Sequence, residues 1–457
     1  AMVLMLPETR NVVQMGFSFC LLILAFNAQS SIEESVISSV GGSIDSHAGY
    51  NSLAVLYFAL TFANFVAAPI VDVVGAKWAM VLGGLCFVVF QVGFLFINST
   101  YLYASSALVG FGAAILFTGQ GSYLSQNCNE RTSGRNSAIV WSMMQGSGLF
   151  GGALLLATFS ITATTDSITK DTVVFLYSVF TGLTVLSVII SALLPAAPSQ
   201  ILASSERLSY GNLIVSIFKL MTTRKMALLA FVFAYTGIET SFWLGIYPTC
   251  ISFTKGLGGK TTQLLSLNTV CVACGQCCAS ILLSMFSSRI AKVGKSSVIF
   301  AGTVANMTIF ALAFLNFPAS ANLDKSDDTG LIGPFVWIVL LGGFLLGFGD
   351  ACWNTQIYAF LVEYYPHYSS QAFAIFKFYQ GAASCSAFFY SSAINLRYNL
   401  LILVVTLLIA VVCFFMVEKL AKYEKSERCF EVEKQRVVSV SSSTVSMYKK
   451  SISSENE

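Results

Sequence analysis

Charged side chains are scarce in this chain. Asp, Glu, Lys and Arg make up 10% of the 457 residues, whereas soluble domains carry roughly a quarter. Hydrophobic residues make up 56%, and the mean hydropathy is +0.74. Because so few charged groups cannot cover the surface of a soluble fold of this length, the composition excludes a water-soluble protein and predicts membrane lipid as its surroundings.

Residues and motifs that serve catalysis are also nearly missing. The chain has two histidines, His47 and His367, and both fall in predicted loops. No Walker, Rossmann or nucleophile-elbow pattern occurs, so we predict neither an enzyme nor an ATP-driven pump, and neither catalytic residues nor a cofactor. The net charge of +3 gives no reason to expect a nucleic-acid partner.

Cysteine is not rare, but its placement is uninformative. Most of the twelve cysteines lie inside apolar segments, where cysteine behaves as a small hydrophobic residue. The cluster at Cys271, Cys274, Cys277 and Cys278 has no histidine beside it and no loop that could close a tetrahedral site. We therefore predict neither a disulfide framework nor a metal site.

The dominant feature of the sequence is a series of long apolar runs. A membrane-spanning helix needs about 20 apolar residues to cross roughly 30 Å of hydrocarbon, and twelve runs meet that length. They cover residues 11–32, 50–71, 78–97, 102–126, 135–159 and 173–194, and then 226–251, 263–286, 296–317, 333–360, 371–393 and 400–417. The first run is too long for a signal-peptide core, so we predict an uncleaved signal anchor. The pattern predicts an all-α membrane protein with twelve transmembrane helices.

Basic residues in the connections indicate the orientation. One side of the membrane receives Arg10, Lys77, Arg131, Arg135, Arg207, Lys219, Arg224, Lys225, Arg289, Lys292 and Lys295. The other side receives only Lys170, Lys255, Lys260, Lys325 and Arg397. Because basic loops stay cytosolic, both termini are predicted to be cytosolic. Plasma membrane and endolysosomal membrane fit this pattern equally well.

The runs divide the chain into four parts. Residues 1–194 and 226–418 are predicted to form two six-helix bundles, joined by a cytoplasmic linker at 195–225 that contains an amphipathic stretch at 212–220. Residues 419–457 mix Lys, Glu and Ser with little apolar content, so we predict a disordered cytoplasmic tail.

The two halves share short matches in the same order. Glu33 in the first run corresponds to Glu239 in the seventh. The sequence GFG at 110 in the fourth run recurs at 347 in the tenth, and QG at 145 in the fifth recurs at 380 in the eleventh. Duplicated six-helix halves are the architecture of a large class of secondary transporters. The repeat therefore predicts two pseudo-symmetric bundles with binding near the membrane midplane.

A cytoplasmic loop motif points the same way. Asp72, Gly75 and Lys77 follow the second run, and Gly294 and Lys295 hold the matching place in the second half. The glycine permits a tight turn, and the acid and base can lock one conformation by charge pairing at the helix ends. This spacing resembles the cytoplasmic gate signature of the major facilitator superfamily.

Four longer stretches carry a narrower resemblance. They are SGRNSAIVW from residue 133, AYTGIE from 234, GFGDACWNTQ from 347 and AFAIFKF from 372. They resemble the UNC-93-like branch of the major facilitator superfamily, which is described as a family of ion channel regulatory proteins. The resemblance is greatest to the orphan members of that branch that are called "major facilitator superfamily domain-containing" proteins. The resemblance implies the major facilitator fold and a family tied to regulation of potassium channels and to trafficking of other membrane proteins. It brings no transported substrate and no catalytic residues.

Charged residues inside the apolar runs are the candidate functional groups. They are Glu33, Glu239, Asp350 and Lys377, and a charge at the bilayer centre costs several kcal/mol. The resemblance implies that the first, fourth, seventh and tenth helices line a central cavity, which would place the three acids on cavity-lining helices. Such carboxylates could bind a proton or a coupling cation. The alternative is that Lys377 forms a fixed ion pair with Asp350 or Glu239.

Uncharged polar residues on the same helices are weaker candidates. Asn354 lies one helical turn beyond Asp350, and Thr355 follows it; Gln120 lies in the fourth run. They could hydrogen-bond a polar solute, or they could join helices to one another. Asn98, in the sequence Asn-Ser-Thr, is a possible glycosylation site close to the membrane.

Two functions fit these features. The first is a carrier that moves a small solute by rocking of its two halves, coupled to a proton or cation. The second is a non-transporting accessory subunit that regulates a potassium channel or the trafficking of another membrane protein. Buried acids favour the first; the family association, and Ala68 and Ala291 at altered signature positions, favour the second.

Overall fold

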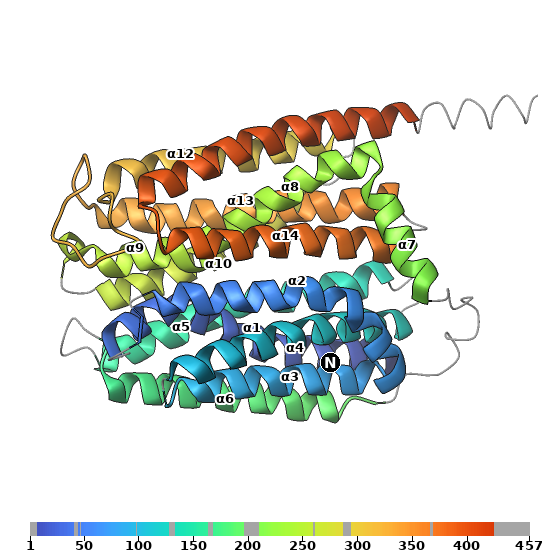
Figure 1. Cartoon of the computed structure of the whole chain (residues 1–457), viewed down its shortest axis with the longest axis horizontal. Coiled ribbons are helices and arrows are strands. Elements are labelled where there is room, and N and C mark those ends of the chain that lie inside the picture. The colour runs from blue at the N-terminus through green and yellow to red at the C-terminus, as the bar shows by residue number, and fades with distance from the viewer. Residues whose placement is uncertain are drawn as a thin grey trace, which may run out of the picture.

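The structure is a computed structural model that describes residues 7–40, 44–45, 47–96, 98–127, 133–162, 168–195, 210–258, 261–286, 294–365 and 369–424. In these ranges the regular elements are helices, and a single isolated β-bridge joins Thr254 to Ser326. The predicted fold class, an all-α membrane protein, is confirmed. Figure 1 shows the long helices running side by side.

The first half of the chain forms six long helices. They are α1 (Pro7–Val40), α2 (Ala48–Val74), α3 (Ala76–Gly93), α4 (Ser99–Gln126), α5 (Ser133–Thr162) and α6 (Lys170–Ala192). The short helix α7 (Tyr210–Met221) follows in the predicted linker. It packs on α14 and places Phe218 in a stacked contact with Phe65 of α2, with ring centroids 6.5 Å apart.

The second half begins with a span that changes helix type part-way. It consists of α8 (Arg224–Ser241), the π-helical turn η3 (Phe242–Ile246) and α9 (Tyr247–Phe253), and the 3-10 turn η4 (Lys255–Leu257) follows it. The remaining long helices are α10 (Thr261–Met285), α12 (Lys295–Asn316), α13 (Val336–Tyr364), α14 (Ser369–Ser391) and a final helix, Leu396–Glu424.

Ten of the spans in the described part of the chain are long and apolar enough to cross a membrane. The two predicted spans outside this set are α5 and α14, which have 30 and 23 residues and are therefore long enough to cross. Both helices carry polar residues, among them Gln145, Lys377 and Gln380. Both helices also contact the opposite half of the chain, since α5 packs on α10 and α14 packs on α2.

The matched glycines make matched contacts in the two halves. A Cβ on Gly110 of α4 would lie 2.2 Å from the Leu56 carbonyl oxygen of α2, and one on Gly347 of α13 would lie 1.9 Å from the Val272 carbonyl oxygen of α10. Two residues later, Gly112 contacts α3 and Gly349 contacts α12. The fourth and tenth spans therefore pack on equivalent neighbours through the same GFG sequence. The exact limits of the two bundles, the linker and the tail remain predictions; the last helix continues to Glu424, and residues 425–457 lie outside the described part.

Candidate functional site

The acid Glu239 lies inside the second half, at the end of α8. Its side chain is 0% exposed, and its Oε1 accepts a hydrogen bond of 2.5 Å from Asn306 Nδ2 of α12. The same Asn306 amide donates to the Tyr235 hydroxyl at 2.7 Å. The second carboxylate oxygen, Oε2, has no hydrogen-bond partner in the described ranges. Glu239 thus joins α8 to α12 through one oxygen, and the Tyr235 hydroxyl lies close enough to its carboxylate to interact with it.

Asp350 lies close enough to Glu239 to interact with it electrostatically. Its Oδ2 accepts from Gln276 Nε2 of α10 at 2.9 Å, and its Oδ1 accepts from Asn354 Nδ2 at 2.9 Å. The indole of Trp243, in the π-helical turn, lies beside it. Asp350 is 7% exposed. The structure therefore brings Glu239, Asp350 and Asn354 together from the seventh and tenth spans.

The fixed ion pair between Lys377 and either acid does not form. Lys377 is exposed, and its Nζ donates to Gln380 Oε1 at 2.8 Å and lies 4.7 Å from the centre of the Phe376 ring. None of the ion pairs in the described part of the chain includes it. The charge of Lys377 acts on Asp350 only through a longer-range electrostatic interaction, without a hydrogen bond or an ion pair. Within the described ranges the two acids therefore have no basic partner in direct contact.

Glu33 is buried separately, in the first half. It is 0% exposed, and its Oε1 accepts from the Ser52 hydroxyl of α2. The neighbouring Glu34 points elsewhere: its Oε2 accepts from the Tyr50 backbone N–H at 2.9 Å. A Cβ on Gly49 would lie 2.7 Å from the Glu34 Cα as well as 2.4 Å from that same oxygen, so the close approach of the two backbones requires glycine there. Glu33 and Glu239 are both buried, but they lie in different halves and have different partners, Ser52 for Glu33 and Asn306 for Glu239.

The other predicted cavity residues make local contacts. Thr355 Oγ1 donates to the Ala351 carbonyl of its own helix at 2.6 Å, and Gln120 Nε2 lies 3.1 Å from Met144 Sδ of α5. Both are half-buried. The central cavity itself remains a prediction.

Residues of the gate signature lie at the predicted helix junctions. Gly75 links α2 to α3 with φ 88°, and Gly294 precedes α12 with φ 111°, a region that favours glycine. Lys295 forms an ion pair with Glu363, and Lys77 lies 5.4 Å from the Trp78 ring centre. The side chain of Asp72 lies outside the described residues, so the acid–base lock remains a prediction.

Asn98 has a structural role at the start of α4. Its Oδ1 accepts from the backbone N–H groups of Thr100 and Tyr101, at 3.0 and 3.2 Å. This is the capping contact that a helix start requires. Its glycosylation remains a prediction.

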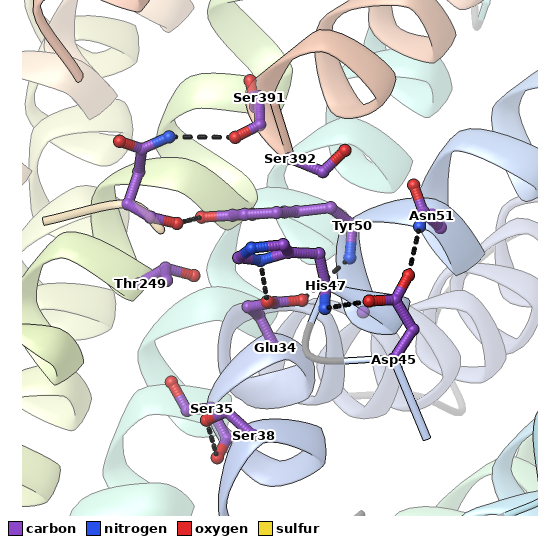
Figure 2. Close-up of polar contacts among 12 residues, drawn as sticks. Glu34, Ser35, Ser38, Asp45, His47, Tyr50, Asn51, Thr249, Ser391 and Ser392 are labelled. Carbon is purple, nitrogen blue, oxygen red and sulfur yellow. Dashed lines mark hydrogen bonds and ion pairs between the residues drawn. The ribbon is translucent and has the colours of Figure 1, made fainter. Parts of the chain in front are cut away.

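A contact between the halves was not foreseen from the sequence. At the end of the bundle where α1 meets α2, here called the α1–α2 end, the Tyr50 hydroxyl donates to the Asn322 carbonyl at 3.2 Å. Figure 2 shows Tyr50 stacked near His47 and facing Thr249 of α9. Asn322 is itself fixed by hydrogen bonds to the Ser391 and Ile394 carbonyls, both 2.9 Å long.

Comparison with known proteins identifies the family. Residues 40–415 match the family described as "Ion channel regulatory protein UNC-93". The chain belongs to the UNC-93 family.

Relatives of this UNC-93 protein match it along most of their length. UNC93-like protein MFSD11 of Xenopus laevis is 32% identical over 440 residues, covering 91% of this chain and 97% of that protein. UNC93-like protein 3 of Arabidopsis thaliana is 26% identical over 415 residues, covering 87% and 83%. Protein unc-93 homolog A of Homo sapiens is 24% identical over 451 residues, covering 90% and 93%.

Solved structures show the fold of this UNC-93 protein. The nucleoside transporter NupG superposes with a TM-score of 0.62 at 13% identity, covering 89% of this chain and 98% of that one. The major facilitator superfamily transporter FucP, in its outward conformation, gives 0.59 at 14% identity, covering 90% and 99%. A POT family transporter in complex with 5-aminolevulinic acid gives 0.66 at 11% identity, covering 90% and 96%. The UNC-93 protein therefore has the major facilitator fold and is a multi-pass integral membrane protein.

Proposed function

We propose that this UNC-93 protein is a secondary carrier of a small solute and that Glu239 and Asp350 couple transport to a proton or a cation. One observation carries the proposal: the two buried carboxyl groups lie close enough to interact electrostatically, and no base among the described residues contacts either of them. Their partners are neutral amides from α10, α12 and α13.

An uncompensated charge is costly in a medium of low dielectric constant. Two ionised carboxylates at close range inside a lipid-embedded bundle repel each other and lose their hydration, so both cannot stay charged and uncompensated. A bound proton or cation removes the cost. A pair of this kind can therefore take up a coupling ion and release it when the surroundings change, as secondary carriers require.

The π-helical turn supports movement at this place. It begins directly after Ser241, two residues beyond Glu239, and it carries Trp243 beside Asp350. Turns with i→i+5 bonding are uncommon in helices and are found often at functional sites. A break in the regular hydrogen-bond ladder also permits a helix to bend. The seventh span can therefore change its shape next to the acidic pair.

The proposal includes the orientation predicted from the basic residues. Both termini face the cytosol, and the α1–α2 end faces the opposite side. The alternative, a non-transporting subunit that regulates a potassium channel or the trafficking of another membrane protein, depends on the family description. Plasma and endolysosomal membranes both fit.

Uptake into proteoliposomes tests the proposal. Purified protein is screened against a panel of small polar solutes under an imposed pH gradient or a Na⁺ gradient. We expect gradient-driven uptake in the wild type and its loss in the double variant Glu239→Gln with Asp350→Asn. The control is Asp327→Asn, because Asp327 is an exposed acid that pairs with Lys255 in a loop. Undiminished gradient-driven uptake in the double variant would show the proposal to be wrong. A protein that transports no solute of the panel but co-purifies with another membrane protein would support the alternative.

A further inference from the structure

Three helices of the first half meet at one level near Glu33. The rings of Phe26 and Phe87 lie 5.3 Å apart, and a Cβ on Gly84 would lie 3.9 Å from Leu22 Cδ1. These contacts set α1 and α3 running in the same direction. One turn further along, residues 29 to 33 of α1 therefore face residues 91 to 94 of α3.

Helix α6 completes this arrangement from the opposite direction. Tyr177 stacks on Phe94 with ring centroids 4.5 Å apart, and a Cβ on Gly84 would lie 2.7 Å from Val188 Cγ2. Tyr177 also lies near enough to Glu33 to interact with it electrostatically. Gln91 precedes Phe94 by one turn on the same face of α3. Side chains of α1, α3 and α6 therefore converge between the three helices.

Four polar side chains occupy this level, and we call them the α1–α3–α6 cluster: Gln29, Glu33, Gln91 and Tyr177. Each is 0% exposed. Six of their polar atoms have no hydrogen bond to a described residue within normal distance and angle limits; they are both amide atoms of Gln29, both amide atoms of Gln91, Glu33 Oε2 and the Tyr177 hydroxyl. The Gln29 amide nevertheless lies close enough to the Glu33 carboxylate to interact with it, so the two side chains share one place. Ser52 satisfies only the other carboxylate oxygen of Glu33. Unpaired polar groups are costly inside a protein and more so within a bilayer.

We propose that the α1–α3–α6 cluster binds a monovalent alkali cation. The cluster offers only oxygen donors to a metal: one carboxylate oxygen, two amide oxygens and one phenol. Oxygen donors select hard cations over transition metals. A single carboxylate neutralises one positive charge, so a divalent ion would leave an uncompensated charge buried in the bundle. This inference goes beyond the proposed carrier activity and does not depend on it, because binding is measured without flux.

Thermal unfolding of the purified full chain tests this site. The protein is held in choline chloride, and NaCl, KCl or LiCl replaces the choline salt at constant ionic strength. A ligand that binds only the folded state raises the unfolding temperature in a saturable way. We expect such a rise with at least one alkali cation and none with choline. Direct binding of radioactive Na⁺ to the same preparations gives a second readout.

Three variants assign the response to the cluster. Tyr177→Phe removes one oxygen but keeps the ring contacts, so we expect the half-saturating cation concentration to rise at least about tenfold. Glu33→Gln should abolish the response. Thr184→Val, a buried change about two turns along α6, should respond as the wild type does. Equal unfolding temperatures in alkali and choline salts, or an unchanged response in both Tyr177→Phe and Glu33→Gln, would overturn the proposal.

Discussion

His47 Nδ1 lies 3.3 Å from Glu34 Oε1, across the turn that joins α1 to α2. The same carboxylate accepts from the backbone of Tyr50, whose hydroxyl reaches Asn322 in the second half. Asp45 accepts from the backbone N–H of His47, at 3.5 Å. Lys325, in the loop that contains Asn322, donates to Ser39 of α1 at 3.1 Å. The pair thus lies where the two halves touch at the α1–α2 end (Figure 2).

The first prediction is a pH-dependent stability from His47. The hydrogen bond to Glu34 raises the pKa of His47, the charges of Glu34, Asp45 and Asp324 add to it, and partial burial opposes it. A raised pKa means that the ion pair stabilises the fold fully below the unfolded value of about 6.5 and that this contribution is lost as the pH rises through the folded pKa.

The measurement compares the wild type with His47→Gln. We expect the wild type to be more stable by about 0.5–1 kcal/mol at about pH 5.5, because the pair is partly screened by solvent. The difference should shrink at about pH 8.5. Thermal unfolding in one detergent at both pH values gives the result. A difference that grows with pH has the wrong sign and would contradict the assigned partner.

The second prediction concerns the contact between the halves. Tyr50→Phe removes the hydroxyl that donates to Asn322, and we expect a loss of about 1 kcal/mol. The α1–α2 end should also open more often, which raises the labelling rate of a cysteine introduced at Thr249. Tyr101→Phe is the matched control, because its hydroxyl donates to Val89 within the first half, at 2.8 Å. Equal labelling rates in both variants would show that the Tyr50 contact does not hold the halves together.

The membrane-spanning helices and the repeat could be predicted from the sequence, but the side chains that contact the buried acids could not. Apolar runs and the two GFG sequences predict spans and a repeat because length and small residues are local properties of the chain. The neutral partners of the acids could not be predicted in this way, since Asn306 and Gln276 lie 67 and 74 residues from the acids that they contact. Helices that are apolar on most sides leave their rotation undetermined by hydropathy.

The contacts of Lys377 and of Tyr50 also differ from what the sequence predicts. Lys377 was a candidate partner for either acid, yet on α14 it lies beside Gln380 and the Phe376 ring. A long side chain can reach away from its own level along the helix, so position alone does not choose its partner. The Tyr50–Asn322 contact involves a loop residue, and loops carry no periodicity from which an approach could be predicted.

The third prediction tests the repeat through its glycines. Gly347→Ala would place a Cβ 1.9 Å from the Val272 carbonyl oxygen, and Gly110→Ala would place one 2.2 Å from that of Leu56. Helix backbones must separate to make room, and we expect each change to cost at least about 1–3 kcal/mol. Gly182→Ala, which meets nothing within 4 Å, should be neutral or stabilising by up to about 1 kcal/mol. Folded yield and unfolding temperature measure the effect, and equal behaviour of the three variants would contradict the matched packing.

The fourth prediction separates a buried acid from its neutral partner. Asn306→Leu removes the amide that donates to Glu239 Oε1 at 2.5 Å, and we expect a loss of about 1–3 kcal/mol because the buried carboxylate then keeps, among the described residues, only the neighbouring Tyr235 hydroxyl. Glu239→Leu alone should also destabilise the protein, since it leaves the Asn306 amide with only Tyr235. Unfolding free energies of the four proteins of this cycle are measured in one detergent.

The double variant decides what the contact contributes. With both polar groups replaced by leucine, neither is left without a partner. We therefore expect the double variant to lose less stability than the two single variants lose together, by about 0.5–3 kcal/mol. Asn306→Leu combined with Asp327→Asn is the control, because Asp327 is a solvent-exposed loop residue and the two losses should add. Additive losses in the first cycle would mean that Glu239 and Asn306 do not stabilise each other, and the buried acid would then need another partner in the folded protein.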